Sequence, residues 1–256
     1  MEFAAHDLLA HFYALLWPML RISALLVAAP IFSLRAVNLR IRIVLALAIT
    51  WLVYPLHDWP TLDPLSAPGL LEIGNQLMIG LLMGLMLQIV TSSILIAGQS
   101  IANAIGLSMA TMIDPNMGNV PVISQFLLVL ATLVFVGLGG HAMLLGLVVE
   151  SFNTLPIGKS LVADVAWRQL VIWSSMLFLG ALLTALPVMV ALLLINIGLG
   201  IATRAAPSLN IFSVGFPAMI FAGFAVLVFA LPSIGARIQW LWIQGFTQVR
   251  TLAGLP

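Results

Sequence analysis

The sequence predicts an all-α protein of the membrane type, with about six apolar segments. Composition is the first observation behind this fold class: of 256 residues, 62% are hydrophobic and 7% are charged, and the mean hydropathy is +1.20. A soluble domain carries roughly 25% charged residues, which it needs to cover its surface. The second observation is charge spacing, because the charges are separated by uncharged stretches long enough for spans of about 20 residues. A soluble enzyme and a disordered chain are therefore excluded.

The first two apolar segments, Leu8–Ala29 and Ile41–Leu56, are the least conventional of the six. The first contains Pro18 and Arg21, and the second is shorter than a full span. An arginine within an apolar segment usually faces protein or water. For Arg21 the alternative is snorkelling or an ion pair at a helix end, and the sequence favours neither.

Four longer apolar segments follow, each inside one uncharged stretch. They are predicted as helices at Leu70–Ala97, Val122–Val149, Gln169–Ile197 and Ile211–Leu231. At a rise of about 1.5 Å per residue, each can cross roughly 30 Å of hydrocarbon. Gly80 and Gly84 lie one turn apart in the first of them. That spacing permits close contact with another helix, although it also arises by chance in a glycine-rich chain.

Helix-breaking residues are frequent within the apolar runs. They include Pro18, Pro187, Pro217, Gly180, Gly198, Gly200, Gly215 and Gly223. Proline removes a backbone donor and kinks a helix. At membrane depth, the freed backbone groups must be satisfied by neighbouring protein. The sequence therefore predicts bent helices packed in an assembly rather than straight, isolated spans.

The charged residues do not define one orientation in a membrane. The first loop carries Arg35, Arg40 and Arg42, whereas the second carries acidic residues and no base. Cytoplasmic loops carry an excess of Lys and Arg, so this contrast puts the first loop in the cytoplasm. Counted over all loops, however, the two sides tie at four bases each. The tie indicates either a different number of helices or an unusual position in the bilayer.

No sequence motif predicts catalysis, a cofactor or a metal site. Gly158-Lys159-Ser160 resembles the end of a phosphate-binding loop, but Asn153 takes the place of its leading glycine. The run Gly137–Ala142 fits a relaxed dinucleotide fingerprint, yet we expect it inside an apolar helix with no strand before it. The chain has no cysteine, and its 4 histidines lack metal-ligand spacing. We expect His141 to make a structural hydrogen bond.

The loop Gly106–Pro121 keeps three methionines through a turn. These are Met109, Met112 and Met117, and the turn-forming residues among them are Asp114, Pro115, Asn116 and Gly118. Methionine is unbranched and deformable, so it fills irregular gaps and yields when something passes. The loop is a candidate for plugging or lining a passage, with core filling as the alternative.

Several segments together resemble the FliR/SctT family of type III secretion export-gate proteins. The clearest is the run from Gly198 to Pro217, which contains Arg204, Pro207, Asn210, Phe212, Gly215 and Pro217. A second segment is Gly106-Leu107-Ser108, which leads to Asp114-Pro115. A third is Gly140-His141, followed by Ser151-Phe152 and Leu155-Pro156. A fourth comprises Arg21, Ala29-Pro30 and the stretch from Arg35 to Arg42. They follow the family's order over nearly the whole chain. The ending Phe212–Pro217 resembles the flagellar branch.

The resemblance implies a fold of kinked helical hairpins within a helical export-gate assembly. The chain would be a non-enzymatic channel subunit that helps form and plug the pore for unfolded flagellar substrates. Its implied partners are about five FliP-type and four FliQ-type subunits, an FlhB-type switch protein and membrane lipid, with no nucleic acid. Its implied place is the bacterial inner membrane at the flagellar basal body, partly raised towards the periplasm. Gly106–Pro121 would be the plug, and the run from Arg204 to Pro217 a structural junction.

The expected subunit comprises residues 1–256 in three parts. Residues 1–60 form an N-terminal apolar hairpin, 61–168 form central helices with the plug loop at 106–121, and 169–256 form a C-terminal helical hairpin and tail. Two rival functions remain. A polytopic solute permease of the inner membrane predicts an internal repeat and a charged site at the midplane, neither of which is evident. A lipid-modifying membrane enzyme needs a polar catalytic constellation, which is also not evident.

Overall fold

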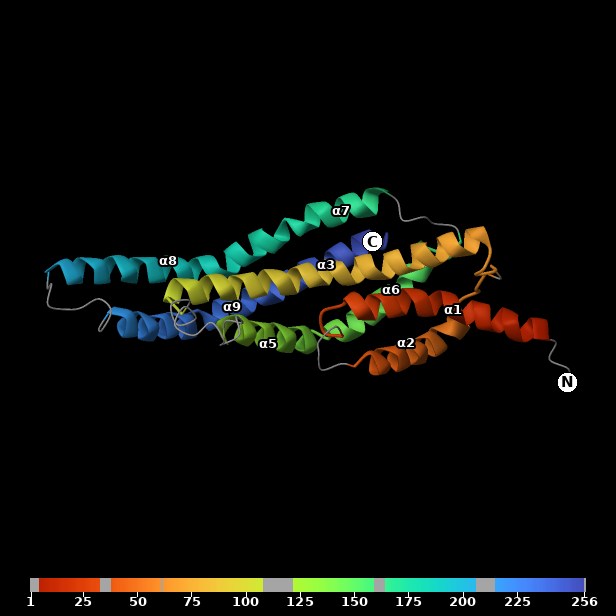
Figure 1. Cartoon of the computed structure of the whole chain (residues 1–256), viewed down its shortest axis with the longest axis horizontal. Helices are drawn as coiled ribbons and strands as arrows, with labels where there is room; N and C mark the ends of the chain where they lie inside the picture. The colour runs from red at the N-terminus through yellow and green to blue at the C-terminus, as the bar shows by residue number, and fades with distance from the viewer. Residues whose placement is uncertain are drawn as a thin grey trace. The chain divides into compact units, whose positions relative to one another are not determined.

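The computed structural model describes residues 5–32, 38–60, 62–107, 122–158, 164–205 and 215–255, with the backbone alone described at 5–10, 164–165 and 216. All regular structure in these ranges is helical (Figure 1). The elements are α1 (Ala5–Ala28), α2 (Leu39–Val53), the short 3₁₀ helix η1 (Tyr54–Leu56), α3 (Ala67–Ile105), α5 (Val122–Gly137), α6 (Gly140–Thr154), α7 (Asp164–Ser174), α8 (Met176–Ala205) and α9 (Phe216–Leu252). The predicted all-α fold class is confirmed.

The apolar helices are long enough to cross a membrane. Five candidate spans occur in the described residues, and the bent pair α5 and α6 can make a sixth. The five are His11–Ala28, Leu39–Leu56, Ala67–Ile105, Ala166–Ala205 and Pro217–Leu252. The expected number of about six apolar segments agrees with these helices.

Three predicted helices differ from the observed ones, and one of them, Gln169–Ile197, is interrupted at Ser175 between α7 and α8. The segment Val122–Val149 was expected to be one helix, but it is broken at Gly139, whose φ of +69° is left-handed. Only glycine adopts this conformation at little cost, so the chain ends α5 here and starts α6. The run Gly137–Ala142 therefore lies at a helix break and not inside a helix. His141 is exposed there.

The last helix was expected to end at Leu231, but α9 continues to Leu252. It passes through Pro232, and Arg237 stacks beside the ring of Trp240, with 5.4 Å between the guanidinium carbon and the ring centroid. Pro217, by contrast, is the second residue of α9. Its missing N–H costs little there, because the first N–H groups of a helix have no helical partner.

Two compact units are each assembled from segments that lie far apart in the sequence. Unit 1 comprises Met1–Ile89, Gly139–Ser174 and Gln244–Pro256, and unit 2 comprises Val90–Leu138 and Ser175–Ile243. In unit 1, the first part of α3 packs against α1 through glycine. A Cβ atom added to Gly84 would lie 2.5 Å from the Cβ of Ala28 and 2.9 Å from its carbonyl carbon. Gly80 likewise faces the backbone at Arg21. The close contact at the Gly80–Gly84 spacing is confirmed.

Small residues and tryptophan join the helices of unit 2. A Cβ atom added to Gly98 of α3 would lie 2.5 Å from the Cα of Ser124 in α5, and the Ser124 hydroxyl donates to the carbonyl of Leu95 at 3.1 Å. The indole N–H of Trp242 in α9 donates to the carbonyl of Ala131 in α5 at 3.0 Å. These contacts hold α3, α5 and α9 at close range.

Candidate functional site

A buried arginine lies at the centre of unit 1. Arg21 is in α1 and is 0% exposed. Its Nε donates to Oε1 of Gln76 in α3 at 2.7 Å. Its Nη1 donates to both the carbonyl and the hydroxyl oxygen of Ser151 in α6, each at 2.9 Å, and its Nη2 donates to the carbonyl of Leu155 at 2.7 Å. One side chain thus joins α1, α3 and the end of α6.

Two of these acceptors are backbone carbonyls at the C-terminal end of α6. The last carbonyls of a helix carry partial negative charge, and that of Ser151 also accepts from the N–H of Leu155 at 2.9 Å. Arg21 supplies further donors and the opposite charge. Its guanidinium also lies over the ring of Phe152, with 4.3 Å between its carbon and the ring centroid. Arg21 therefore caps α6 from a different helix.

The charge of Arg21 is balanced by Glu72 through an amide. Glu72 is 5% exposed, and its Oε1 accepts a 2.5 Å hydrogen bond from Nε2 of Gln76, the residue whose oxygen binds Arg21. Asn75 donates to Oε2 of Glu72 at 3.4 Å. A buried ion costs several kcal/mol unless its hydrogen bonds are satisfied and an opposite charge is near. Of the two sequence interpretations, Arg21 facing protein is the correct one.

An aromatic cluster adjoins this network. The rings of Trp59 and Phe152 meet edge to face with centroids 5.2 Å apart, and a ring nitrogen of His57 lies 3.1 Å from Oδ1 of Asn153. The side chains of His57, Trp59 and Phe152 border a pocket of about 310 Å³ together with Asp58 and Pro156. The residues present do not form a nucleophile with its base. Among the described residues, no group of three potential metal ligands occurs either.

The outer faces of several helices are apolar and exposed. Along α8, one stripe of mostly small residues is buried, whereas large side chains on the other faces are exposed: Phe178, Leu182, Val190, Leu193, Leu194, Ile197 and Ile201. In α9, Phe221 is 79% and Phe229 is 86% exposed. Soluble monomers rarely expose apolar patches above a few hundred Å². Lipid or other apolar protein must cover these faces.

Comparison with known proteins assigns the chain to a family. The family described as bacterial export proteins, family 1, matches residues 12–244. The chain belongs to this family. It is 36% identical over 247 residues to the flagellar biosynthetic protein FliR of Pectobacterium carotovorum subsp. carotovorum, an alignment that covers 96% of this chain and 95% of the relative.

Further members of the export family align over most of the chain. The flagellar biosynthetic protein FliR of Escherichia coli K12 is 35% identical over 231 residues, covering 90% of this chain and 88% of that protein. The FliR protein of Bacillus subtilis strain 168 is 28% identical over 248 residues, covering 95% and 96%. These relatives place the chain in the flagellar branch of the FliR family, as the sequence motifs predicted.

Only the first residues of the predicted plug loop are among the described residues. Gly106 follows the last residue of α3 with a φ of +93°, and the N–H of Leu107 donates to the carbonyl of Ala102 at 3.1 Å. A left-handed glycine at this position is a common way to end a helix. The other predicted plug residues, Met109, Met112, Asp114, Pro115, Asn116, Met117 and Gly118, lie outside the described residues. The plug stays a prediction.

The predicted junction of this export-family chain is also described only at its ends. Arg204 lies in the last turn of α8 and is exposed, Gly215 is buried before α9, and Pro217 is exposed in its first turn. Pro207, Asn210 and Phe212 lie outside the described residues. The role of the junction therefore also stays a prediction.

Sequence reasoning missed the partners of Arg21. Gln76 is 55 positions away and Ser151 is 130 positions away. One signal was available: Glu72 and Gln76 are four residues apart, so both lie on the face of α3 that Gly80 and Gly84 continue. The glycines marked the face that contacts another helix, and the polar pair lay one and two turns before them.

Proposed function

We propose that this chain is a non-enzymatic channel subunit of the flagellar type III export gate, and that it helps form and plug the pore for unfolded flagellar substrates. Membership of the bacterial export family and the flagellar names of its relatives support this function. The observation that carries it is the combination of a well-packed interior with helices whose outer faces are widely apolar. A subunit surrounded by similar apolar subunits needs both features.

The partners we propose are about five FliP-type subunits, about four FliQ-type subunits and an FlhB-type switch protein. The candidate spans that contain α8 and α9 are only 33% and 22% buried within the chain, so most of their apolar surface is available to neighbours. The chain would lie in the bacterial inner membrane at the flagellar basal body, partly raised towards the periplasm. Along the sequence it would use residues 1–60, 61–168 and 169–256 as hairpin, plug-bearing centre and C-terminal hairpin.

The plug we propose is the loop Gly106–Pro121. Two long helices, α3 and α5, flank this loop, and α3 ends sharply at Gly106. The methionines Met109, Met112 and Met117 would form a soft apolar barrier to ions, because their side chains deform without leaving polar groups in the gap. The turn at Asp114-Pro115 would shape the loop.

Deletion of Ala110–Gly118 tests the plug directly. We expect the deletion to leave the complex assembled and to make cells leak ions, as measured by the uptake of a small charged dye. Replacing Met109, Met112 and Met117 together with leucine is the matched control, because leucine keeps the apolar volume and should keep the seal. A deletion that changes neither ion leak nor export would overturn the plug assignment.

We further propose that the run from Arg204 to Pro217 is a structural junction between hairpins. It connects α8 to α9, and the Arg204 guanidinium reinforces the C-terminal end of α8, where a positive charge is favourable. Arg204→Ala should reduce the yield of assembled complex. A normal yield together with a specific change in pore leak would contradict a structural role.

A further inference from the structure

Helix α2 has an unusually exposed apolar surface. Its buried residues, Ala46, Ile49, Thr50 and Val53, form one narrow stripe against the rest of unit 1. The side chains on the other faces are large, apolar and exposed: Leu39, Ile41, Ile43, Val44, Leu47, Trp51 and Leu52. The candidate span Leu39–Leu56 is 17% buried, the lowest value of the five spans. If one helix of another protein packed against α2, it would cover one further stripe of these side chains and leave the other apolar side chains exposed.

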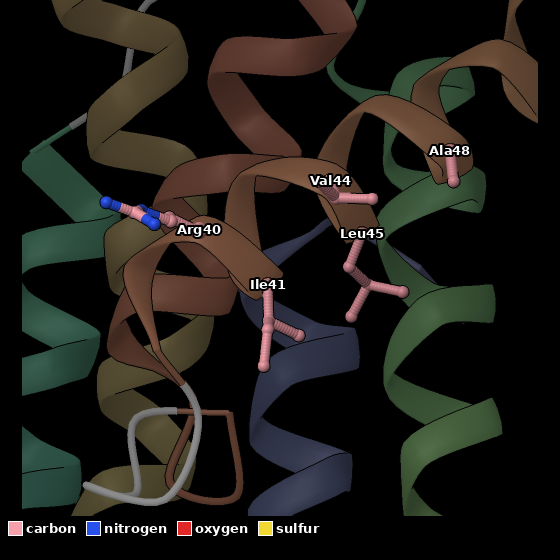
Figure 2. Close-up of a pocket in the computed structure, with 5 residues that line it drawn as sticks. All are labelled: Arg40, Ile41, Val44, Leu45 and Ala48. Carbon is pink, nitrogen blue, oxygen red and sulfur yellow. The ribbon is translucent and has the colours of Figure 1, made fainter.

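A shallow groove of about 380 Å³ runs along the outward side of α2. It is lined by Arg40, Ile41, Val44, Leu45 and Ala48. Figure 2 shows Arg40 at one end of this row and Ala48 at the other, with the guanidinium directed away from the apolar side chains. From Arg40 to Ala48 the helix rises by about 12 Å. The groove thus combines a cationic end with an otherwise apolar wall.

The charge at this end has no acidic counterpart nearby in the sequence. Between Asp7 and Asp58 the chain contains no Asp or Glu, whereas it contains several arginines. Arg40 is exposed, and within the described part of the chain it has no ion pair. The N-terminus of α2 adds partial positive charge at the same place. An occupant of the groove must therefore be anionic at one end and apolar along the remainder.

We propose that this groove binds an anionic phospholipid, with its phosphate at Arg40 and an acyl chain along Ile41, Val44, Leu45 and Ala48. A lipid fits better than a partner helix for two reasons. Lipid can cover all the exposed apolar side chains of α2. Its negative charge is confined to the headgroup, which matches the single cationic end of the groove at Arg40. Anionic headgroups at a membrane surface attract Lys and Arg side chains. The proposal rests on the membrane location of the proposed function, and not on the plug or on export.

Lipid binding by the purified full-length chain tests the proposal. Native mass spectrometry in detergent would measure the binding of phosphatidylglycerol and of phosphatidylcholine to the same protein. We expect tighter binding of phosphatidylglycerol, and about a fivefold loss of that affinity in Arg40→Gln, because one arginine near an anionic headgroup contributes roughly that factor. Arg40→Lys should retain most of it. Arg168→Gln is the matched control, because Arg168 is exposed in the same unit, and it should bind like the unchanged protein.

Equal affinity for the two lipids would overturn the proposal. It would also be overturned if Arg40→Gln and Arg168→Gln lost the same share of the affinity for phosphatidylglycerol. A second measurement distinguishes lipid from protein as the occupant. Since the chain has no cysteine, Val44→Cys carries a single photoreactive label in the membrane-embedded complex. We expect label adducts with lipid. Adducts with another subunit would show that protein covers the groove, which overturns the lipid site and leaves the proposed export function unaffected.

Discussion

Replacing Arg21 with methionine should destabilise the chain more than any exposed arginine substitution. Arg21→Met keeps an apolar stem of similar length but removes every donor of the guanidinium. The carbonyls of Ser151 and Leu155 and the side-chain oxygen of Gln76 then lose their charged partner inside the protein. Glu72 also loses the positive charge that balances it through Gln76.

The expected cost is about 3–5 kcal/mol, because removing one member of a buried charged network leaves the others unpaired. For a chain of this size, this corresponds to a fall in melting temperature of about 6–20 °C. The assay is thermal unfolding of the detergent-purified chain, followed by circular dichroism. Arg168→Gln, at an exposed position, is the control and should change the unfolding free energy by less than about 0.5 kcal/mol.

A double-mutant cycle makes the reasoning specific. Adding Glu72→Gln to Arg21→Met removes a buried carboxylate that has already lost its counter-charge, so the second change should cost less than Glu72→Gln alone. The coupling should lie in the range of about 0.5–3 kcal/mol that groups in one network show. A melting temperature for Arg21→Met equal to that of Arg168→Gln, or strictly additive costs in the cycle, would refute the network.

Three further substitutions test the packing with the same assay. Gly84→Ala should lower the free energy of unfolding by about 1–3 kcal/mol, because the new Cβ would lie 2.5 Å from a side-chain carbon of α1. Its control is Gly74→Ala in the same helix, where the new Cβ meets nothing within 4 Å. This control should raise the free energy of unfolding by about 0.5–1 kcal/mol. Gly139→Ala should lower the free energy of unfolding by about 1–2 kcal/mol, because the φ of this residue is positive. At Gly137 an added Cβ has open space around it, so Gly137→Ala should leave the stability unchanged or raise it. Trp242→Phe leaves a buried carbonyl without its indole donor and should cost about 1–3 kcal/mol. Equal effects within a glycine pair would contradict the close contact assigned to Gly84 or the backbone strain assigned to Gly139.

Helix identity was predictable from the sequence because it depends on local composition. Six apolar segments separated by charges indicate six apolar helical regions, and the observed helices agree. Helix ends were less predictable. The last helix was placed inside one uncharged stretch and expected to end at Leu231, yet α9 continues past Arg237 to Leu252. An arginine can lie along a helix when a ring such as that of Trp240 packs beside it.

The helix break at Gly139 was not predicted from the sequence, because it depends on the backbone conformation of one residue. Two glycines with one residue between them permit a break without requiring one. The positive φ of Gly139 makes the break, and no local pattern fixes that angle. The cluster around Arg21 was beyond sequence reasoning for a different cause. Its members come from α1, α3 and α6, so only the tertiary fold brings them together.

The central claim is that this member of the bacterial export family works as one subunit of a larger gate. The most direct test is the mass and composition of the particle that contains the tagged full-length chain after gentle extraction from the membrane. We expect a hetero-oligomer far heavier than the 27.4 kDa chain, with one copy of it beside about five FliP-type and four FliQ-type subunits. A monomer or homodimer active in solute transport would contradict the claim and favour a permease.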